Sequence, residues 1–259
     1  MKVFALLRCL RRAFLKKDEY AQYVLAESLT RVIYAPYKFS EFGRLFLEDQ
    51  SFLKDYERFE RQNHRSLDRK YVAYQMAKLV KHIEGDTAEC GVYQGATSFL
   101  ICKQMRDCGK THHIFDSFAG LSAPGSHDGA YWQQGDLSAG EEVVRANLKD
   151  FSFVEYHPGW VPDKFAEVAE KRFCYVHIDM DLYRPTLDSL AFFYPRMTPG
   201  GIIICDDYGF RTCPGAQKAM DSFFADKAEE IVCLPTGQAF VLCHIPTGGS
   251  QRRQLSKEG

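Results

Sequence analysis

Beyond residue 85, short apolar stretches alternate with longer segments of helical spacing. The apolar stretches predict five strands, at 87–90, 112–115, 153–156, 173–178 and 201–205. The segments between and after them predict helices near 97–107, 141–149, 162–171, 186–196 and 215–228. Strands that alternate with helices are typical of a parallel sheet with helices on both faces. The pattern therefore predicts a doubly wound α/β fold.

The last part of the chain follows a different pattern. Two apolar stretches, 230–234 and 239–244, flank the turn sequence Pro-Thr-Gly-Gln and predict an antiparallel hairpin. A doubly wound sheet that ends in such a hairpin differs from the nucleotide-binding fold of dehydrogenases. It resembles the Rossmann-like class I methyltransferase fold, whose last strand enters the sheet antiparallel. The polar stretch 247–259 predicts a flexible tail.

The first 66 residues lack the strand pattern and predict a helical extension, with breaks near Pro36 and Gly43. A further helix is predicted over 66–85, with an apolar face made of Val72, Met76, Leu79, Val80 and Ile83. We therefore expect an extension over 1–66, an α/β domain over 67–246 and the flexible tail.

Residues 1–17 carry six basic side chains and no acidic one. Wound as a helix, this segment gathers its apolar residues on one broad face, namely Val3, Phe4, Leu6, Leu7, Leu10 and Phe14. A basic amphipathic helix can contact an anionic membrane surface. More often such a helix packs on its own domain or on a second subunit, and we favour packing here. Arg8 interrupts the apolar run too early for a signal peptide.

Composition narrows the class of protein. The 259 residues are 46% hydrophobic and 26% charged, which is typical of a soluble globular protein. The net charge of −1 argues against a nucleic-acid partner, and no apolar window is long enough for a transmembrane helix. The nine cysteines include no Cys-x-x-Cys pair, which predicts reduced thiols in a cytoplasmic protein.

Ligands of open parallel sheets bind beyond the carboxyl ends of the strands. After the first predicted strand, Gly91 and Gly95 permit a tight turn and a close approach to a ligand. After the second strand, Asp116 either binds the hydroxyls of a ribose or is a turn residue. Dehydrogenases that use NAD also carry an acid at this position, so Asp116 alone does not identify the cofactor. Trp160, after the third strand, either flanks an adenine or packs in the core. The residues that follow these three strands therefore do not identify the cofactor.

Acidic residues follow the fourth and fifth strands, at Asp179, Asp181, Asp206 and Asp207. Acids next to buried apolar strands are costly unless they are paired or bind a cation. Because the strand ends share one sheet edge, we expect these carboxylates to converge, rather than to be unrelated solvated acids. Oxygen ligands favour Mg²⁺, Ca²⁺ or Mn²⁺. Residues two apart on an extended strand project to the same face, so Asp181 is expected beside Asp179.

Together these segments resemble the macrocin O-methyltransferase family, which includes enzymes that act on macrolide and aminocoumarin sugars. The matching pieces cover roughly 67–244 and read Glu-Cys-Gly-Val-Tyr-Gln-Gly (89–95), Asp-Ser-Phe-Ala-Gly-Leu (116–121), His-Ile-Asp-Met-Asp-Leu-Tyr (177–183), Thr-Pro-Gly-Gly (198–201) and Asp-Asp-Tyr-Gly (206–209). More distantly, the chain is similar to catechol-type O-methyltransferases. The resemblance implies S-adenosylmethionine as methyl donor and a Mg²⁺-dependent transfer to a hydroxyl, typically on a sugar or glycoside.

The resemblance also implies roles for individual residues. The methionine part of the cofactor would be surrounded by Glu89, Gly91, Tyr93, Gly95 and Thr97. Asp116, with Ser117 beside it, would hold the ribose, and Trp160 would lie by the adenine. The metal would be bound by Asp179, Asp206 and Asp207. Asp181 matches the proposed general base, with Asp179, His177 or His127 as alternatives.

Outside these motifs the resemblance is weaker. Residues 122–140 fall where relatives carry a loop over the substrate, and 1–66 fall where relatives cover the site and form homo-oligomers. A phenol or catechol acceptor stays open, because the same metal chemistry serves any pair of vicinal oxygens. A nicotinamide-dependent oxidoreductase is disfavoured by the missing Gly-x-Gly-x-x-Gly, and a non-catalytic binding module by the retained acids.

Overall fold

The computed structural model describes residues 3–34, 45–59 and 66–244. The chain forms two compact units, Met1–Leu53 and Lys54–Gly259. This division lies before residue 66, where the sequence predicted the boundary. The predicted division into an extension over 1–66, an α/β domain over 67–246 and a tail therefore stays a prediction. The breaks near Pro36 and Gly43 and the tail over 247–259 lie outside the described residues.

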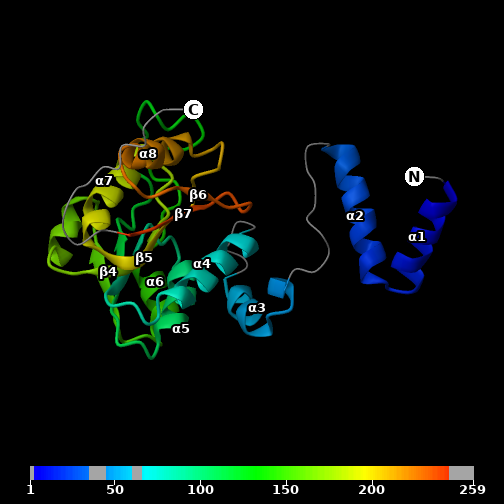
Figure 1. Ribbon diagram of the computed structural model, residues 1–259, viewed down its shortest axis with the longest axis horizontal. Coiled ribbons are helices and arrows are strands. Elements are labelled where there is room, and N and C mark those ends of the chain that lie inside the picture. Colours follow the sequence, from blue (N-terminus) through cyan, green and yellow to red (C-terminus); the bar gives the residue numbers. More distant parts are fainter. Residues whose placement is uncertain (1–2, 35–44, 60–65, 245–259) are drawn as a thin grey trace, which may run out of the picture. The chain divides into compact units, whose positions relative to one another are not determined.

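The N-terminal unit contains a helical hairpin, made of α1 (Val3–Leu15) and α2 (Glu19–Ile33), which is followed by η1 (Leu45–Leu47) (Figure 1). Asp18 caps α2 by accepting a 2.9 Å hydrogen bond from the Ala21 N–H, and its carboxylate pairs with Arg12 at 2.6 Å. The buried residues between the two helices include Ala13 and Ala21. Small side chains therefore let the helices pack closely.

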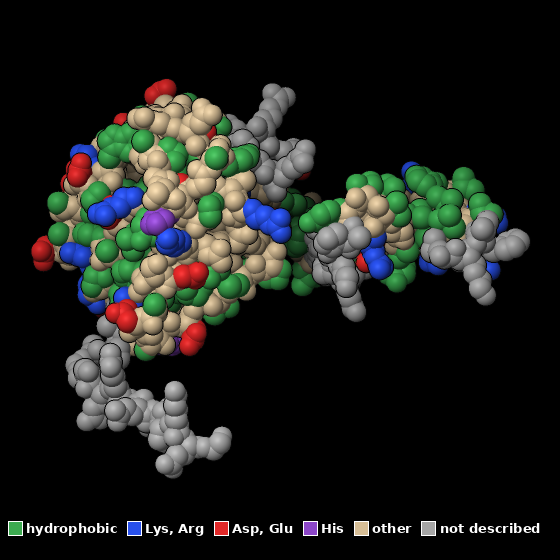
Figure 2. All heavy atoms as spheres, turned by 90° about the horizontal axis from the view of Figure 1, so that it is seen from above, with side chains coloured by type: hydrophobic (Ala, Val, Ile, Leu, Met, Phe, Trp, Pro, Cys, Tyr) green, Lys and Arg blue, Asp and Glu red, His purple; other side chains and the backbone are tan. Residues whose placement is uncertain are grey.

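The predicted helix over residues 1–17 is confirmed, but its apolar face is not fully buried in the described chain. Leu7 is 56% exposed and Phe14 is 72% exposed. Hydrophobic side chains are visible at the surface of this unit in Figure 2. The helix α3 (Gln50–Glu57) spans the division between the two units. Among the helices of the described ranges, none combines the length and the apolarity that crossing a membrane requires.

A seven-stranded sheet forms the core of the second unit, in the order β3-β2-β1-β4-β5-β7-β6. Its strands are β1 (Asp86–Cys90), β2 (His112–Asp116), β3 (Val154–Pro158), β4 (Phe173–Ile178), β5 (Met197–Cys205), β6 (Val232–Cys233) and β7 (Ala239–Leu242). The first five strands pair in parallel, and β7 is antiparallel to both β5 and β6. The predicted doubly wound sheet with its closing hairpin is confirmed.

Helices cover both faces of this sheet (Figure 1). They are α4 (Leu67–Leu79), α5 (Ala96–Met105), α6 (Glu141–Leu148), α7 (Tyr183–Phe193) and α8 (Pro214–Phe224), with the short 3-10 helices η2 (Asp163–Val168) and η3 (Tyr194–Arg196). Leu190, Phe193 and Met220 of α7 and α8 pack with Val176 and Ile203 of the sheet. On the other face, residues of α4 and α5 pack with the neighbouring strand positions, namely Ala77, Ile101, Met105, Tyr175, Ile202 and Ile204.

Two helix predictions need correction. The segment 162–171 forms only the 3-10 helix η2. The helix predicted over 66–85 ends at Leu79, and Leu79 is 66% exposed although the periodicity had placed it on the apolar face. The buried residues of α4 are Ala73, Tyr74 and Ala77, so the helix presents mainly small side chains to the core. This close packing brings the first turn of α4 near the carboxyl ends of the strands.

Candidate active site

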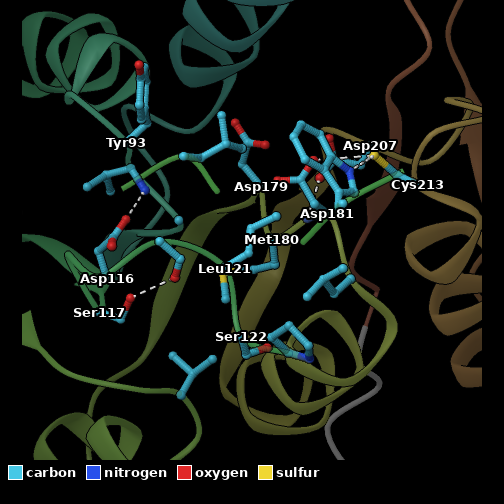
Figure 3. A pocket seen from close by; sticks show the side chains of 18 of the residues that line it. Tyr93, Asp116, Ser117, Leu121, Ser122, Asp179, Met180, Asp181, Asp207 and Cys213 are labelled. Carbon is cyan, nitrogen blue, oxygen red and sulfur yellow. Dashed lines mark hydrogen bonds between the residues drawn. The ribbon is translucent and has the colours of Figure 1, made fainter. Parts of the chain in front are cut away.

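A cavity of about 850 Å³ lies at the carboxyl ends of the parallel strands (Figure 3). Such a volume suits a cofactor together with part of a second molecule. The lining includes eight of the residues predicted for the site, namely Gly91, Tyr93, Asp116, Ser117, Trp160, Asp179, Asp181 and Asp207. Four predicted residues are not among the lining residues: Glu89, Gly95, Thr97 and Asp206. The sequence therefore located the cavity, and part of the predicted set lies behind its wall.

The glycine turn after β1 has a structural reason besides ligand access. Gly91 has φ +78°, and a Cβ at this position would lie 1.9 Å from the backbone oxygen of Asp179. Gly95 is the N-cap of α5 with φ +85°, and a Cβ there would lie 3.2 Å from Val144. The two glycines let the ends of β1 and β4 approach each other and let α5 start. Tyr93, between them, also adopts a positive φ.

Glu89 is buried beneath this turn. Its carboxylate accepts a hydrogen bond from Ser98, and one of its oxygens lies 3.3 Å from Nδ1 of His177. These contacts, and the nearby Lys70, offset the burial penalty, so the pKa of Glu89 is lowered. Thr97 accepts a 2.5 Å hydrogen bond from Lys70 of α4. In this structure Glu89 and Thr97 stabilise the wall of the cavity.

Asp116 ends β2 and faces the cavity. One of its carboxylate oxygens accepts a 2.7 Å hydrogen bond from the N–H group of Val92 (Figure 3). The other accepts a 2.7 Å hydrogen bond from the N–H group of Phe118. Burial nevertheless raises the pKa of this carboxyl. The two N–H groups fix the carboxylate, and its remaining lone pairs are able to accept hydroxyls of a ligand. The neighbouring Ser117 hydroxyl donates to the Gly120 carbonyl at 3.0 Å.

The acids after β4 and β5 converge as predicted. One carboxylate oxygen from each of Asp179, Asp206 and Asp207 lies within 4.8 Å of the others. Asp206 also contacts three cationic or polar side chains that the sequence reasoning did not assign to the metal site. Arg69 of α4 forms an ion pair with it, Gln238 donates at 2.6 Å, and Nε2 of His177 lies at 3.2 Å.

The charges at this edge are unevenly compensated. Asp206 is the acid whose pKa is lowered, because Arg69 and His177 outweigh its burial. Burial, together with the charge of Asp206, raises the pKa of Asp179 to about 6. Burial and the neighbouring acids raise the pKa of Asp207 well above its usual range. The cluster thus needs more positive charge than the protein supplies, and a cation among these oxygens would provide it.

Asp181 borders the cavity as predicted, but the backbone conformation that places it there is not the predicted extended strand. The strand β4 ends at Ile178, so strand alternation does not apply to Asp181. Asp181 lies in a turn with φ +57°, and its N–H donates to Asp207 at 2.9 Å. Its carboxylate accepts a 3.3 Å hydrogen bond from the Cys213 thiol. Burial, and then the charge of Asp179, raise the pKa of Asp181 to about 7.

The two histidines considered as bases are less suited to that role. Burial opposes charge on His177, but hydrogen bonds to Asp206 and Glu89 raise the pKa of His177 to about 9. It is therefore protonated near neutral pH. His127 does not line the cavity, and its Nδ1 lies 2.9 Å from Nζ of Lys218. Unlike these histidines, Asp181 and the alternative Asp179 both line the cavity and have a raised pKa, and of the two Asp181 is not part of the proposed set of metal ligands.

The segment after β2 forms another wall of the cavity, through Leu121, Ser122, Tyr131 and Trp132. The Trp132 indole N–H donates to Cys213 at 3.3 Å. Asp128 is buried and accepts 2.6 Å hydrogen bonds from the N–H groups of Gly125 and Tyr183. These contacts tie the predicted substrate loop to the first turn of α7.

The parallel sheet, its antiparallel closing hairpin and the cavity at the strand ends define a class I methyltransferase fold. The solved structure of the O-methyltransferase NovP matches with a TM-score of 0.59 and 26% identity, over 69% of this chain and 80% of that one. A calicheamicin methyltransferase structure matches with a TM-score of 0.60 and 18% identity, over 79% of this chain and 99% of that one.

The model of the macrocin-O-methyltransferase (TylF) family matches residues 64–231, and the chain belongs to this family. An 8-demethyl-8-(2,3-dimethoxy-alpha-L-rhamnosyl)-tetracenomycin-C 4'-O-methyltransferase of Streptomyces olivaceus is 32% identical over 53% of this chain and 58% of its own length. Demethyldecarbamoylnovobiocin O-methyltransferase of Streptomyces niveus is 29% identical over 59% of this chain and 64% of its own length. The matches thus span less than two thirds of these relatives.

Proposed function

We propose that this protein transfers a methyl group from S-adenosylmethionine to a hydroxyl of a sugar or glycosylated small molecule, with the help of Mg²⁺. The observation that carries the proposal is the convergence of Asp179, Asp206 and Asp207 beside the cavity, which Asp179 and Asp207 line and Asp116 also faces. Family membership supports it, as do the names of the relatives, which describe O-methylation of glycosylated compounds. We further propose a cytoplasmic location.

The residues around the glycine turn fit the methyl donor. Asp116 and Ser117 would hold the ribose side, Trp160 is 44% exposed at the cavity and would lie against the adenine, and Tyr93 would border the methionine part. Glu89, Gly95 and Thr97 would act by holding the turn in place. S-adenosylmethionine supplies an electrophilic methyl group on its sulfonium.

The acid cluster fits a hard divalent cation. Its donor set consists of carboxylate oxygens, which Mg²⁺ prefers, and the cluster lacks compensating positive charge. Asp179, Asp206 and Asp207 would hold the ion, and Arg69 would release part of its contact with Asp206. A Mg²⁺ ion there would act as a Lewis acid and orient the acceptor hydroxyl.

Asp181 would accept the proton of the acceptor hydroxyl. A sugar hydroxyl is too weak an acid to ionise alone near pH 7, so the transfer needs a base. Asp181 borders the cavity and is only 6% exposed, so its carboxylate has little contact with bulk water. The raised pKa of about 7 suits a general base at neutral pH.

A methyl-transfer screen tests this proposal. The full chain is incubated with isotopically labelled S-adenosylmethionine, Mg²⁺ and a panel of glycosides, free sugars and catechols, and mass spectrometry locates the methyl group. We expect a methylated sugar hydroxyl in at least one glycoside. Methylation of catechols alone would show that the acceptor is a catechol and not a sugar. NAD-dependent oxidation without methyl transfer would show that the protein is an oxidoreductase and not a methyltransferase.

Loss of the Asp116 carboxylate is expected to weaken S-adenosylmethionine binding. A hydrogen bond to a charged group contributes about 1.5–3 kcal/mol, so Asp116→Ala should raise the dissociation constant roughly tenfold to a hundredfold. Calorimetry measures this change. Asp150→Ala, at an exposed aspartate after α6, is the matched control. Because Asp116 also accepts two backbone hydrogen bonds, circular dichroism must show that the variant folds; unchanged affinity in a folded variant would refute the assignment.

We propose that residues 1–66 serve as a cover and an assembly surface, rather than as a membrane anchor. The exposed apolar side chains of the helical hairpin, including Leu7, Phe14 and Val32, support an interface with protein. Light scattering should show an oligomer for the full chain and a smaller species for a chain that lacks residues 1–17. Flotation with anionic liposomes is the opposing test, and strong, salt-sensitive binding by the full chain alone would favour the membrane.

A further inference from the structure

A second group of titratable side chains lies on β2 and β3, outside the lining of the cavity. His113 is fully buried and His157 is 6% exposed. Nδ1 of His113 lies 3.1 Å from Nε2 of His157. A carboxylate oxygen of Glu155 lies 3.4 Å from the same Nδ1. The two ring nitrogens and the carboxylate oxygen therefore meet at one point.

Strand pairing explains why these residues meet. His113 of β2 is in register with Glu155 of β3, and Phe115 is in register with His157. Alternate residues of a strand project from the same face, so His113 and Phe115 share a face with Glu155 and His157. The ring of His157 stacks on Phe115 with a centroid distance of 4.5 Å, which fixes its orientation.

The outer nitrogen of each histidine faces another carboxylate. Nε2 of His113 lies 3.2 Å from Asp86, and Nδ1 of His157 lies 2.6 Å from Glu167. An ionised carboxylate only accepts hydrogen bonds, so each outer nitrogen carries the proton. A neutral imidazole has one N–H group, and both inner nitrogens then present lone pairs. With both rings neutral and these outer protons in place, the three atoms that converge are all acceptors.

We propose that this cluster binds a divalent transition-metal ion such as Zn²⁺ through His113 Nδ1, His157 Nε2 and the Glu155 carboxylate. The three ligand atoms lie within 4.8 Å of one another. Zinc bonds to nitrogen measure about 2.0–2.1 Å, so two nitrogens 3.1 Å apart need only a small adjustment to share an ion. Nitrogen and oxygen donors suit zinc, whereas the acid cluster in the cavity offers oxygen alone.

The surroundings of the cluster support a metal site. Asp86 and Glu167 orient the two imidazoles through their outer N–H groups, as carboxylates do behind histidine ligands of zinc. Glu155 has a side chain that is 56% exposed on the edge strand β3, so an ion has access from solvent. A bound ion would join β2 to β3, while the carboxylate contacts connect the site to β1 and η2.

Zinc titration of the chelator-treated full chain tests this proposal. Calorimetry with ZnCl₂ is run in excess Mg²⁺, so that the acid cluster is occupied. We expect one zinc ion per chain at the histidine cluster, and X-ray absorption should detect two imidazole ligands and an oxygen. Glu155→Gln should weaken zinc binding at least tenfold, and Glu167→Gln about 10–100-fold, since it acts on the ligand through its hydrogen bond. Both glutamates are exposed, so these variants are expected to fold.

Glu170→Gln is the matched control, because Glu170 is an exposed glutamate beyond η2 outside the cluster. Its zinc affinity should equal that of the parent chain. His157→Asn should lose the site, provided that circular dichroism shows a folded chain. The proposal is overturned if the parent chain takes up no zinc under these conditions, in which case the inner nitrogens share a proton. It is also overturned if Glu155→Gln binds zinc as the parent does, or if absorption detects sulfur ligands.

Discussion

Removal of Mg²⁺ by EDTA is expected to abolish methyl transfer. In Asp206→Asn, we expect that added Mg²⁺ does not restore the activity. Asp206 lies at the centre of the cluster, since it contacts Arg69, His177 and Gln238 as well as the proposed ion. A metal that acts as Lewis acid and template contributes several kcal/mol to the transition state. We therefore expect kcat/KM to fall about 10³-fold or more in the variant.

The measurement is a Mg²⁺ titration of the initial rate after EDTA treatment, for the parent chain and for Asp206→Asn. Asp207→Asn is a second variant, because loss of the Asp206 charge removes one acidic partner from both Arg69 and His177. Asp150→Asn, at an exposed position outside the cavity, serves as the control. Full activity of the parent chain in EDTA would remove the metal from the mechanism.

The sequence predicted the parts of the site that local pattern determines. Apolar runs that stop at glycine or acid mark the strand ends, and parallel pairing brings those ends to one edge. Asp116 and Asp207 therefore lie on the same cavity even though the chain separates them by about ninety residues. The closing hairpin was predictable for the same reason, because its two apolar stretches flank a turn sequence.

Arg69 and Gln238 could not be assigned from the sequence. Arg69 lies 137 residues before Asp206 in the chain, and it reaches the acid because α4 packs closely on the sheet. The predicted apolar face was right in part: Met76 and Val80 pack on the core, Leu79 is exposed, and the buried residues of α4 itself are mostly alanines. Gln238 directly precedes β7, and it reaches Asp206 because β7 pairs with β5.

The backbone conformation of the turn at Asp181 could not be predicted from the local sequence either. A left-handed backbone is usually marked by glycine or asparagine, and here an aspartate adopts it. The turn is held by the hydrogen bond from the Asp181 N–H to Asp207, a contact between two strand ends. Its geometry therefore depends on tertiary structure, although the residue itself had been identified.

Replacement of Asp181 by asparagine is expected to lower kcat by about 10²–10⁴-fold, the usual contribution of a general base. Asparagine tolerates the left-handed turn and keeps an oxygen for the Cys213 thiol, so the fold should be unchanged. The affinities for S-adenosylmethionine and Mg²⁺ should stay within about twofold of the parent values, because the proposed ligands are intact.

The pH profile separates a base from a structural residue. Burial and Asp179 raise the pKa of Asp181 to about 7, and a base acts only when it is unprotonated. In the parent chain kcat should therefore rise as the pH increases towards neutrality, and Mg²⁺ beside Asp181 should move this rise to lower pH. The same rise should be absent in Asp181→Asn. A variant with near-normal kcat and an unchanged pH profile would exclude Asp181 as the base, and the metal site would still be judged by its own EDTA and Asp206→Asn measurements.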